Sequence, residues 1–208
     1  TAQIASLTTE QLPALTTGQA AALTTAQVAA LTTEQLPSLQ TADLVGMSTA
    51  QLAAIDAAKV SALGTEQIQS LTNAQMAGLR TAQIAALSTE QIAAIETTDI
   101  RAMTSAQIGA LTTEQAAALT SAQVLAIETA DLRALQTAAV AILSSEQLSA
   151  LSTAQAAALT SAQLNALTTE QVTQLDVADV AALTAAQVAA WSTDNVASLT
   201  TAQVVGLT

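Results

Sequence analysis

Apolar and polar positions recur every eight residues along the whole chain. Counted from Leu7, residues 7–206 divide into 25 octads with no insertion or deletion, and Leu87-Ser-Thr-Glu-Gln-Ile-Ala-Ala94 is typical. Positions 1 and 6 are always apolar, position 3 is nearly always Thr or Ser, and position 5 is Gln in 18 of the 25 octads. A fixed short period of this kind indicates a tandem-repeat architecture and not an ordinary globular domain.

The period of eight predicts a helix that breaks once in every octad. Eight residues of α-helix advance about 800°, so positions 1 and 6 would spread around the surface of one continuous helix. That excludes a single long helix and a coiled coil, in which the apolar positions form one stripe. Each octad is therefore expected to form a helix of about one and a half turns, followed by a corner.

The polar residues mark the start of each short helix. Thr or Ser at position 2, with Gln three residues later, matches a capping box, and the apolar positions 1 and 6 match a hydrophobic staple. Glu at position 4 lies in the first turn, where negative charge suits the helix dipole. Position 3 stays open as an alternative N-cap, because position 2 also accepts other residues. These include Gln40, Asp56, Gly64, Arg80, Glu96 and Glu128.

A β-solenoid is the competing interpretation, which the many Thr residues suggest. Strands that face a core need apolar residues at alternate positions, but here they stand at positions 1 and 6 and often at 7 and 8. Ala, Gln and Glu are also weak strand formers. The helical interpretation is therefore favoured.

The acids at position 4 carry a second period. From Glu10 to Asp194 they recur on average every 26 residues or so, which is about 3.3 octads. Inheritance from a larger ancestral unit would explain this spacing, but we favour a superhelix that places the acids along one side. The expected fold class is all-α, a tight solenoid or superhelix of very short helices, one per octad, with about 3.3 octads per turn. Stacking at helix-packing distance would give a rod on the order of 65–80 Å long.

The repeat also predicts the domain organisation. Residues 1–208 are expected to form a single octapeptide-repeat array, whose 25 full octads span residues 7–206. Thr1 lies in the middle of an octad, and neither end shows a capping repeat of the kind that closes such arrays. We therefore expect the chain to be a fragment of a longer array.

Composition and charge narrow the partners. The net charge is −12, with only four basic residues, which argues against binding to nucleic acid or to an anionic membrane surface. The longest apolar run, 138–143, is too short to insert into a membrane. Trp191, the single aromatic residue, is expected to be a larger core residue and not a binding anchor. Pro13 and Pro37, both at position 7, are expected to mark irregular octads.

No catalytic residue, cofactor-binding residue or metal ligand is predicted, and no cofactor. The chain has neither His nor Cys, which excludes a zinc site of the usual kind and leaves Ser and Thr without a histidine base. Two pairs of acids could in principle serve calcium, but each is followed by an Arg, so helix-surface charge pairs are preferred. The pairs are Glu96 with Asp99, followed by Arg101, and Glu128 with Asp131, followed by Arg133.

Runs such as Ala-Leu-Thr-Thr-Ala-Gln-Val-Ala-Ala-Leu-Thr, at residues 22–32, resemble the octapeptide-repeat regions of large bacterial secreted or cell-surface, adhesin-like proteins. That resemblance extends over the whole chain and implies an extracellular or cell-surface location. Residues 167–172 also resemble a helix start in TAL-effector repeats, but the period of about 34 residues and the base-reading loop of that family are missing.

These observations predict a structural protein and not an enzyme. The leading hypothesis is an extracellular spacer, stalk or filament segment of a large bacterial surface or secreted protein. Its partners would be neighbouring repeats of the same array, further copies through self-assembly, or other surface proteins. The alternatives are an ice- or crystal-surface binder that presents a ladder of Thr, and a repeat scaffold that binds proteins or glycans.

Overall fold

A computed structural model describes residues 2–207, and the chain divides after Met103 into two compact units. Across the described range there are 24 α-helices, two 3-10 helices and no strand. The all-helical fold class is therefore confirmed, and the β-solenoid is excluded. No helix between residues 2 and 207 is both long and apolar enough to span a membrane.

In the first unit each octad contributes one short helix, as the sequence predicts. Eleven of these are α-helices of four to six residues and two are 3-10 helices of three residues. In chain order they are α1 (Ala2–Ala5), η1 (Leu12–Ala14), α2 (Thr17–Ala21), α3 (Thr25–Ala29), η2 (Leu36–Ser38), α4 (Thr41–Gly46), α5 (Thr49–Ala53), α6 (Ala57–Val60), α7 (Thr65–Gln69), α8 (Asn73–Gly78), α9 (Thr81–Ala85), α10 (Thr89–Ala94) and α11 (Thr97–Ala102).

The second unit repeats this arrangement with thirteen α-helices, again one per octad. In chain order they are α12 (Ser105–Gly109), α13 (Thr113–Ala118), α14 (Ser121–Ala126), α15 (Thr129–Leu132), α16 (Thr137–Val140), α17 (Ser145–Ser149), α18 (Thr153–Ala158), α19 (Ser161–Ala166), α20 (Thr169–Gln174), α21 (Val177–Ala181), α22 (Ala185–Ala189), α23 (Thr193–Ser198) and α24 (Thr201–Gly206).

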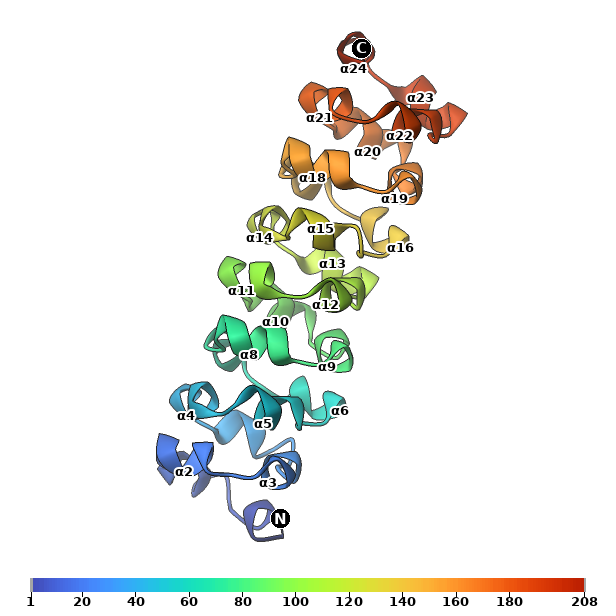
Figure 1. The fold of residues 1–208 in the computed structure, drawn as a ribbon. Helices are drawn as coiled ribbons and strands as arrows, with labels where there is room; N and C mark the ends of the chain where they lie inside the picture. The colour runs from blue at the N-terminus through green and yellow to red at the C-terminus, as the bar shows by residue number, and fades with distance from the viewer. Residues whose placement is uncertain (1, 208) are drawn as a thin grey trace. The chain divides into compact units, whose positions relative to one another are not determined.

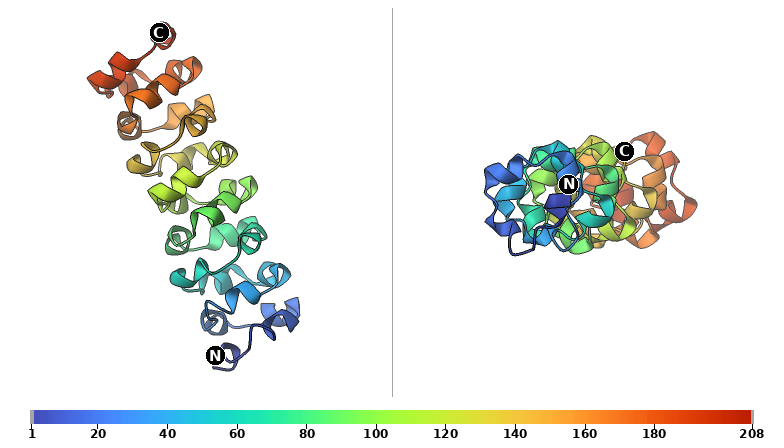
Figure 2. Two further views of the ribbon diagram at one scale, coloured as in Figure 1. Left: turned by 180° about the vertical axis from the view of Figure 1, so that it is seen from behind. Right: turned by 90° about the horizontal axis from the view of Figure 1, so that it is seen from below.

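Within each unit, helices pack against the helix three octads further along the chain. In the first unit α5 contacts α8 and α8 contacts α11, and in the second α15 contacts α18 and α18 contacts α21 (Figure 1). The view from behind shows that the helices on the far side of each unit in Figure 1 are also stacked in successive tiers (Figure 2). Each unit is therefore a solenoid in which a helix has its main contacts in the tiers next to its own.

Side-chain contacts between neighbouring tiers fix the length of one turn. The Asn73 side chain donates to the carbonyl of Thr98, 25 residues later, and the Ser105 hydroxyl donates to the Asp131 carboxylate, 26 residues later. Gln40 donates to a carbonyl 27 residues earlier. These separations agree with the predicted turn of about 3.3 octads.

The helix boundaries settle which position is the N-cap. In α3 the N-cap is Thr24 at position 2, whose hydroxyl accepts from the backbone N–H of Gln27 at 3.2 Å, while the Gln27 side-chain oxygen accepts from the Thr24 N–H at 2.8 Å. The corner arises because positions 1 and 2 are both extended, as at Leu79 (ψ 143°) and Arg80 (ψ 150°). The predicted capping box at position 2 is confirmed, and position 3 begins the helix.

Positions 1 and 6 supply the thin core of each unit. Ile92 and Leu148 at position 6 have no exposed surface, and Ala116 fills the same position in its octad. Val204, at position 6 of α24, departs from this pattern and is 53% exposed. The predicted core residue Trp191 is buried, and its indole N–H has no hydrogen-bond partner.

Pro13 and Pro37 produce the two irregular octads that the sequence predicts. Each lies inside a 3-10 helix, η1 or η2. Proline has no N–H, so the α-helical bond back to position 3 cannot form, and the chain tightens into a 3-10 turn.

Candidate functional site: the corners between helices

The corners between helices hold the most regular polar chemistry of both units. The last carbonyl groups of a short helix have no partner within that helix. We use the term corner carbonyls for the backbone carbonyl oxygens at positions 6 and 7 of an octad and at position 1 of the next. In most octads a Gln side chain at position 5, one turn further along the chain, donates hydrogen bonds to them.

Gln163 shows both halves of this arrangement. Its side-chain oxygen accepts a hydrogen bond from the backbone N–H of Thr160 at 2.8 Å, which is part of the capping box of α19. Its side-chain nitrogen donates to the carbonyls of Leu132 and Leu135, at 3.0 and 2.8 Å, in the preceding turn. The side chain is 1% exposed, so these bonds form away from water. One amide therefore caps its own helix and joins it to the neighbouring turn.

The same link recurs through both units. At least twelve Gln side chains at position 5 donate to the position-1 carbonyl 28 residues earlier, and each also reaches a carbonyl 30 or 31 residues earlier. They are Gln35, Gln51, Gln67, Gln75, Gln83, Gln91, Gln147, Gln155, Gln163, Gln171, Gln187 and Gln203.

This second role of Gln was not predicted, although the sequence carries a signal for it. A capping box accepts Glu as readily as Gln, yet position 5 is never Glu in the 25 octads. The side-chain oxygen alone completes the capping box, so capping does not explain the choice. The side-chain nitrogen does explain it, because only an amide also supplies donors to the corner carbonyls.

Gln side chains at position 2 reach the same corner carbonyls when position 5 has no Gln. The Gln40 side chain donates to the carbonyl of Pro13 at 2.6 Å, in the octad whose position 5 is Asp43. Gln136 donates to the carbonyl of Gly109 at 3.1 Å, in the octad whose position 5 is Ala. In these two octads the donor therefore reaches the corner from position 2.

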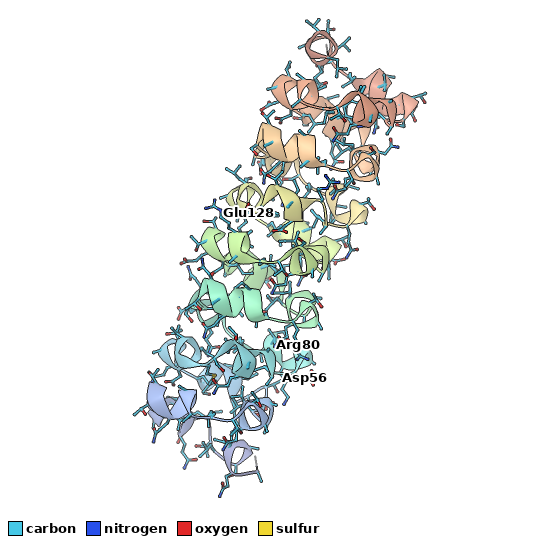
Figure 3. All side chains as sticks on the ribbon, in the orientation of Figure 1. Asp56, Arg80 and Glu128 are labelled. Atoms are coloured by element: carbon cyan, nitrogen blue, oxygen red, sulfur yellow. The ribbon has the colours of Figure 1, made fainter. Side chains whose placement is uncertain are left out.

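Two basic side chains also donate to corner carbonyls. The ammonium group of Lys59, at position 5, donates to the carbonyls 30 and 28 residues earlier at 3.0 and 2.8 Å. The guanidinium group of Arg80, at position 2, donates to the carbonyl of Ile55 at 2.8 Å. Figure 3 shows Arg80 one tier away from Asp56, on the same edge of the first unit. A corner can therefore hold a positive charge in place of an amide.

In α11 and α21 both position 2 and position 5 carry acids. Asp99 and Asp179 replace Gln at position 5 of α11 and α21, where Glu96 and Asp176 replace the Thr or Ser at position 2. Asp99 is 2% exposed and Asp179 is 3% exposed. Each has one buried carboxylate oxygen without a hydrogen-bond partner.

Burial changes the acidity of both aspartates. It raises the pKa of Asp99 to about 6, and the nearby carboxylate of Glu96 adds to the increase. Burial also raises the pKa of Asp179, while a hydrogen bond from Thr153 opposes this rise and the nearby Asp176 adds to it. Both corners therefore hold the carboxylate less favourably than water does.

The two acid pairs of the sequence analysis have different surroundings. The prediction of a helix-surface charge pair is wrong for Asp99, because its side chain is buried. Asp131 is half-buried and accepts from Ser105, and Glu128 is exposed at the N-cap of α15 (Figure 3). Within residues 2–207 no three His, Cys, Asp or Glu side chains come together as a metal-binding group.

A comparison with protein families decides what kind of repeat this is. The family model of the ALTTAQ repeat matches residues 1–25, 36–73, 92–126, 124–161, 148–177 and 172–208, which together make up most of the chain. The chain belongs to the ALTTAQ repeat family. Its ALTTAQ octads form a structural repeat module, in which Thr caps the helix and Gln joins successive turns. No curated protein matches the chain.

Proposed function

We propose that this ALTTAQ module acts as an extracellular spacer, stalk or filament segment of a large bacterial surface or secreted protein. The observation that carries the proposal is the repeated Gln link, since the same bonds join each turn to the next in both units. In such an array each turn depends mainly on its neighbours, so added octads add length and no new chemistry. The likeness to octapeptide regions of bacterial surface proteins supports the extracellular setting.

The net charge of −12 fits this role. Like charges along a repetitive surface keep the chain soluble and discourage unspecific association. The acids at position 4, such as Glu90, Glu114 and Glu146, are exposed. Neighbouring repeats of the same array are therefore the partners for which the chain is best equipped, with self-assembly or other surface proteins as further partners.

The ladder of Thr needed for an ice-binding surface is less well supported. At position 2 the hydroxyl is engaged in capping, as when Thr24 and Thr104 accept from the backbone N–H of a Gln. A flat surface binder needs hydroxyl groups that face outward in a regular array, and these face their own helix.

The spacer proposal is tested by measuring length. Small-angle scattering or electron microscopy of residues 1–208 should show an elongated particle on the order of 65–80 Å long, as stacking at helix-packing distance requires. Duplicating residues 143–166, which make up three whole octads and so a little less than one turn, should lengthen the particle by about 7–9 Å without widening it. A compact particle, or a duplication that leaves the length unchanged, would refute the proposal. Antibody labelling of intact bacterial cells that carry the protein tests the extracellular location separately.

A further inference from the structure

The corners of α11 and α21 differ from the other corners described above, because the residues at positions 2 and 5 of these octads are both acids and bring no amide or ammonium donor. We call them the acid corners; in each, the repeat pattern matches the acids at positions 2 and 5 with two corner carbonyls of the preceding turn. By this spacing Glu96 and Asp99 of α11 correspond to the carbonyls of Gln69 and Leu71, and Asp176 and Asp179 of α21 correspond to those of Ser149 and Leu151.

The spacing of the repeat matches both acids of an acid corner to the same two carbonyls. Side chains at position 5 reach carbonyls 28 and 30 residues earlier, as Lys59 does. Side chains at position 2 reach carbonyls 25 and 27 residues earlier, as Gln136 does. Position 2 precedes position 5 by three residues, so these separations lead to the same two carbonyls. In the acid corner of α11 they are the carbonyls of Gln69 and Leu71.

No positive group of the surrounding helices compensates the carboxylates. α8, which packs against α11, has no charged residue, and Glu66 is the only charged residue of α7. Arg101 is two residues from Asp99, and residues at this spacing do not share a helix face. Around the other acid corner, α18 and α24 pack against α21 and carry no charge, and Glu146 is the only charge of α17.

Such a set of oxygens is unfavourable unless a positive charge joins it. A buried carboxylate oxygen without a partner, of which Asp99 and Asp179 have one each, carries a desolvation cost, and the carbonyls at the end of a helix bear partial negative charge. The corner of Lys59 shows how this fold meets that demand. There an ammonium group lies within 3.0 Å of two corner carbonyls.

We propose that the acid corners are binding sites for divalent cations, with calcium preferred over magnesium. Ca²⁺ takes six to eight oxygen ligands, including carboxylates, backbone carbonyls and water, in flexible geometry. Asp is one methylene shorter than Gln, so its carboxylate leaves free the space that the Gln amide nitrogen occupies in other corners. A cation in that space bridges the carboxylate to the corner carbonyls. With two carboxylates and two carbonyls per site, water completes the shell, and we expect a Kd on the order of 10⁻⁴–10⁻³ M.

The test converts each acid corner into an ordinary Gln corner. The first variant combines Glu96→Thr with Asp99→Gln, and the second combines Asp176→Thr with Asp179→Gln. Equilibrium dialysis with radioactive calcium, in 0.15 M NaCl, counts the ions bound by the full chain. Each variant should bind one ion fewer than the wild type, and a chain with both changes two fewer. Thermal unfolding should show a calcium-dependent rise in the midpoint of the wild type that shrinks with each variant, whereas magnesium should have a smaller effect.

A matched control removes the same charge away from the corners. Glu34→Gln with Glu90→Gln removes two exposed acids from the first unit and should leave calcium binding as in the wild type. The variants restore the commonest octad pattern and are therefore expected to fold without calcium. Equal binding by wild type and corner variants would overturn the proposal, as would a wild type that binds no calcium at 10 mM. A wild type whose stability responds to pH but not to calcium would show that a proton neutralises the corner, which also overturns the proposal. None of these outcomes depends on whether the particle is a spacer.

Discussion

Two neighbouring octads of the first unit, 87–94 and 95–102, form helices of equal length but have opposite chemistry at position 5. α10 and α11 each have six residues. Gln91 of α10 accepts from the N–H of Ser88 at 2.8 Å and donates to the carbonyl of Leu63 at 2.6 Å. Asp99 of α11 makes no capping box and has a carboxylate oxygen without a partner.

Different residues form each helix and join the successive turns. α11 keeps its backbone hydrogen bonds, such as Ile100 N–H to Glu96 at 3.0 Å, and buries Ile95 and Ile100 in the core like any other octad. The apolar positions and the extended corner are therefore enough to make the helix. The residue at position 5 determines how firmly one turn is bound to the next, and there α10 and α11 differ.

The largest difference in stability is expected when the side chain at position 5 is truncated to Ala in one octad or the other. Gln91→Ala leaves the Ser88 N–H and the Leu63 carbonyl without their side-chain partners in a buried corner, since Gln91 is 2% exposed. Each such group costs about 1–3 kcal/mol, so for the two groups we expect a loss on the order of 2–6 kcal/mol in the free energy of unfolding. Asp99→Ala removes a carboxylate oxygen that has no partner, and in calcium-free buffer at pH 7 it should be neutral or stabilising. Urea unfolding followed by circular dichroism measures both.

A second variant isolates the donor. Gln91→Glu keeps the size of the side chain and the oxygen that accepts from Ser88, but it replaces the donating nitrogen with an acceptor. It should also be destabilising at pH 7. Equal losses for Gln91→Ala and Asp99→Ala would mean that the corner bond contributes nothing specific, and would contradict the comparison.

A smaller effect is expected from the titration of Asp99. Its pKa rises from 3.8 to about 6 on folding, so the folded state binds more protons between these pH values. Stability must then fall as pH rises through that range, and it should level off above about pH 6. Measured in EDTA, the unfolding midpoint of the wild type should fall relative to that of Asp99→Asn between about pH 4 and pH 6. Parallel pH profiles for the two proteins would rule out this account of the corner.

Most of the fold could be predicted from the sequence because each octad encodes its own helix. Capping at position 2, the core at positions 1 and 6, and the irregular octads at Pro13 and Pro37 depend on contacts within a few residues. The turn length was also accessible, because the exposed acids recur with the same period as the contacts between tiers. The corner bonds were harder, since they join residues 28–31 apart and depend on how the turns stack. The burial of Asp99 followed from that stacking and was therefore missed.

The smallest effect is expected at Glu90, nine residues before Asp99, and it has the opposite sign with pH. Hydrogen bonds from its own backbone N–H and from the Ser88 hydroxyl lower the pKa of the exposed Glu90 below 4.5. Its stabilising effect is therefore present above pH 4.5 and is lost as pH falls through the lower, folded-state value. Glu90→Gln should cause a small drop in the unfolding midpoint at pH 7 and none at pH 2, whereas Asp99→Asn should have no destabilising effect at pH 7 in EDTA. A Glu90→Gln effect that persists at low pH would show that the side chain acts through packing and not through its charge at the helix start.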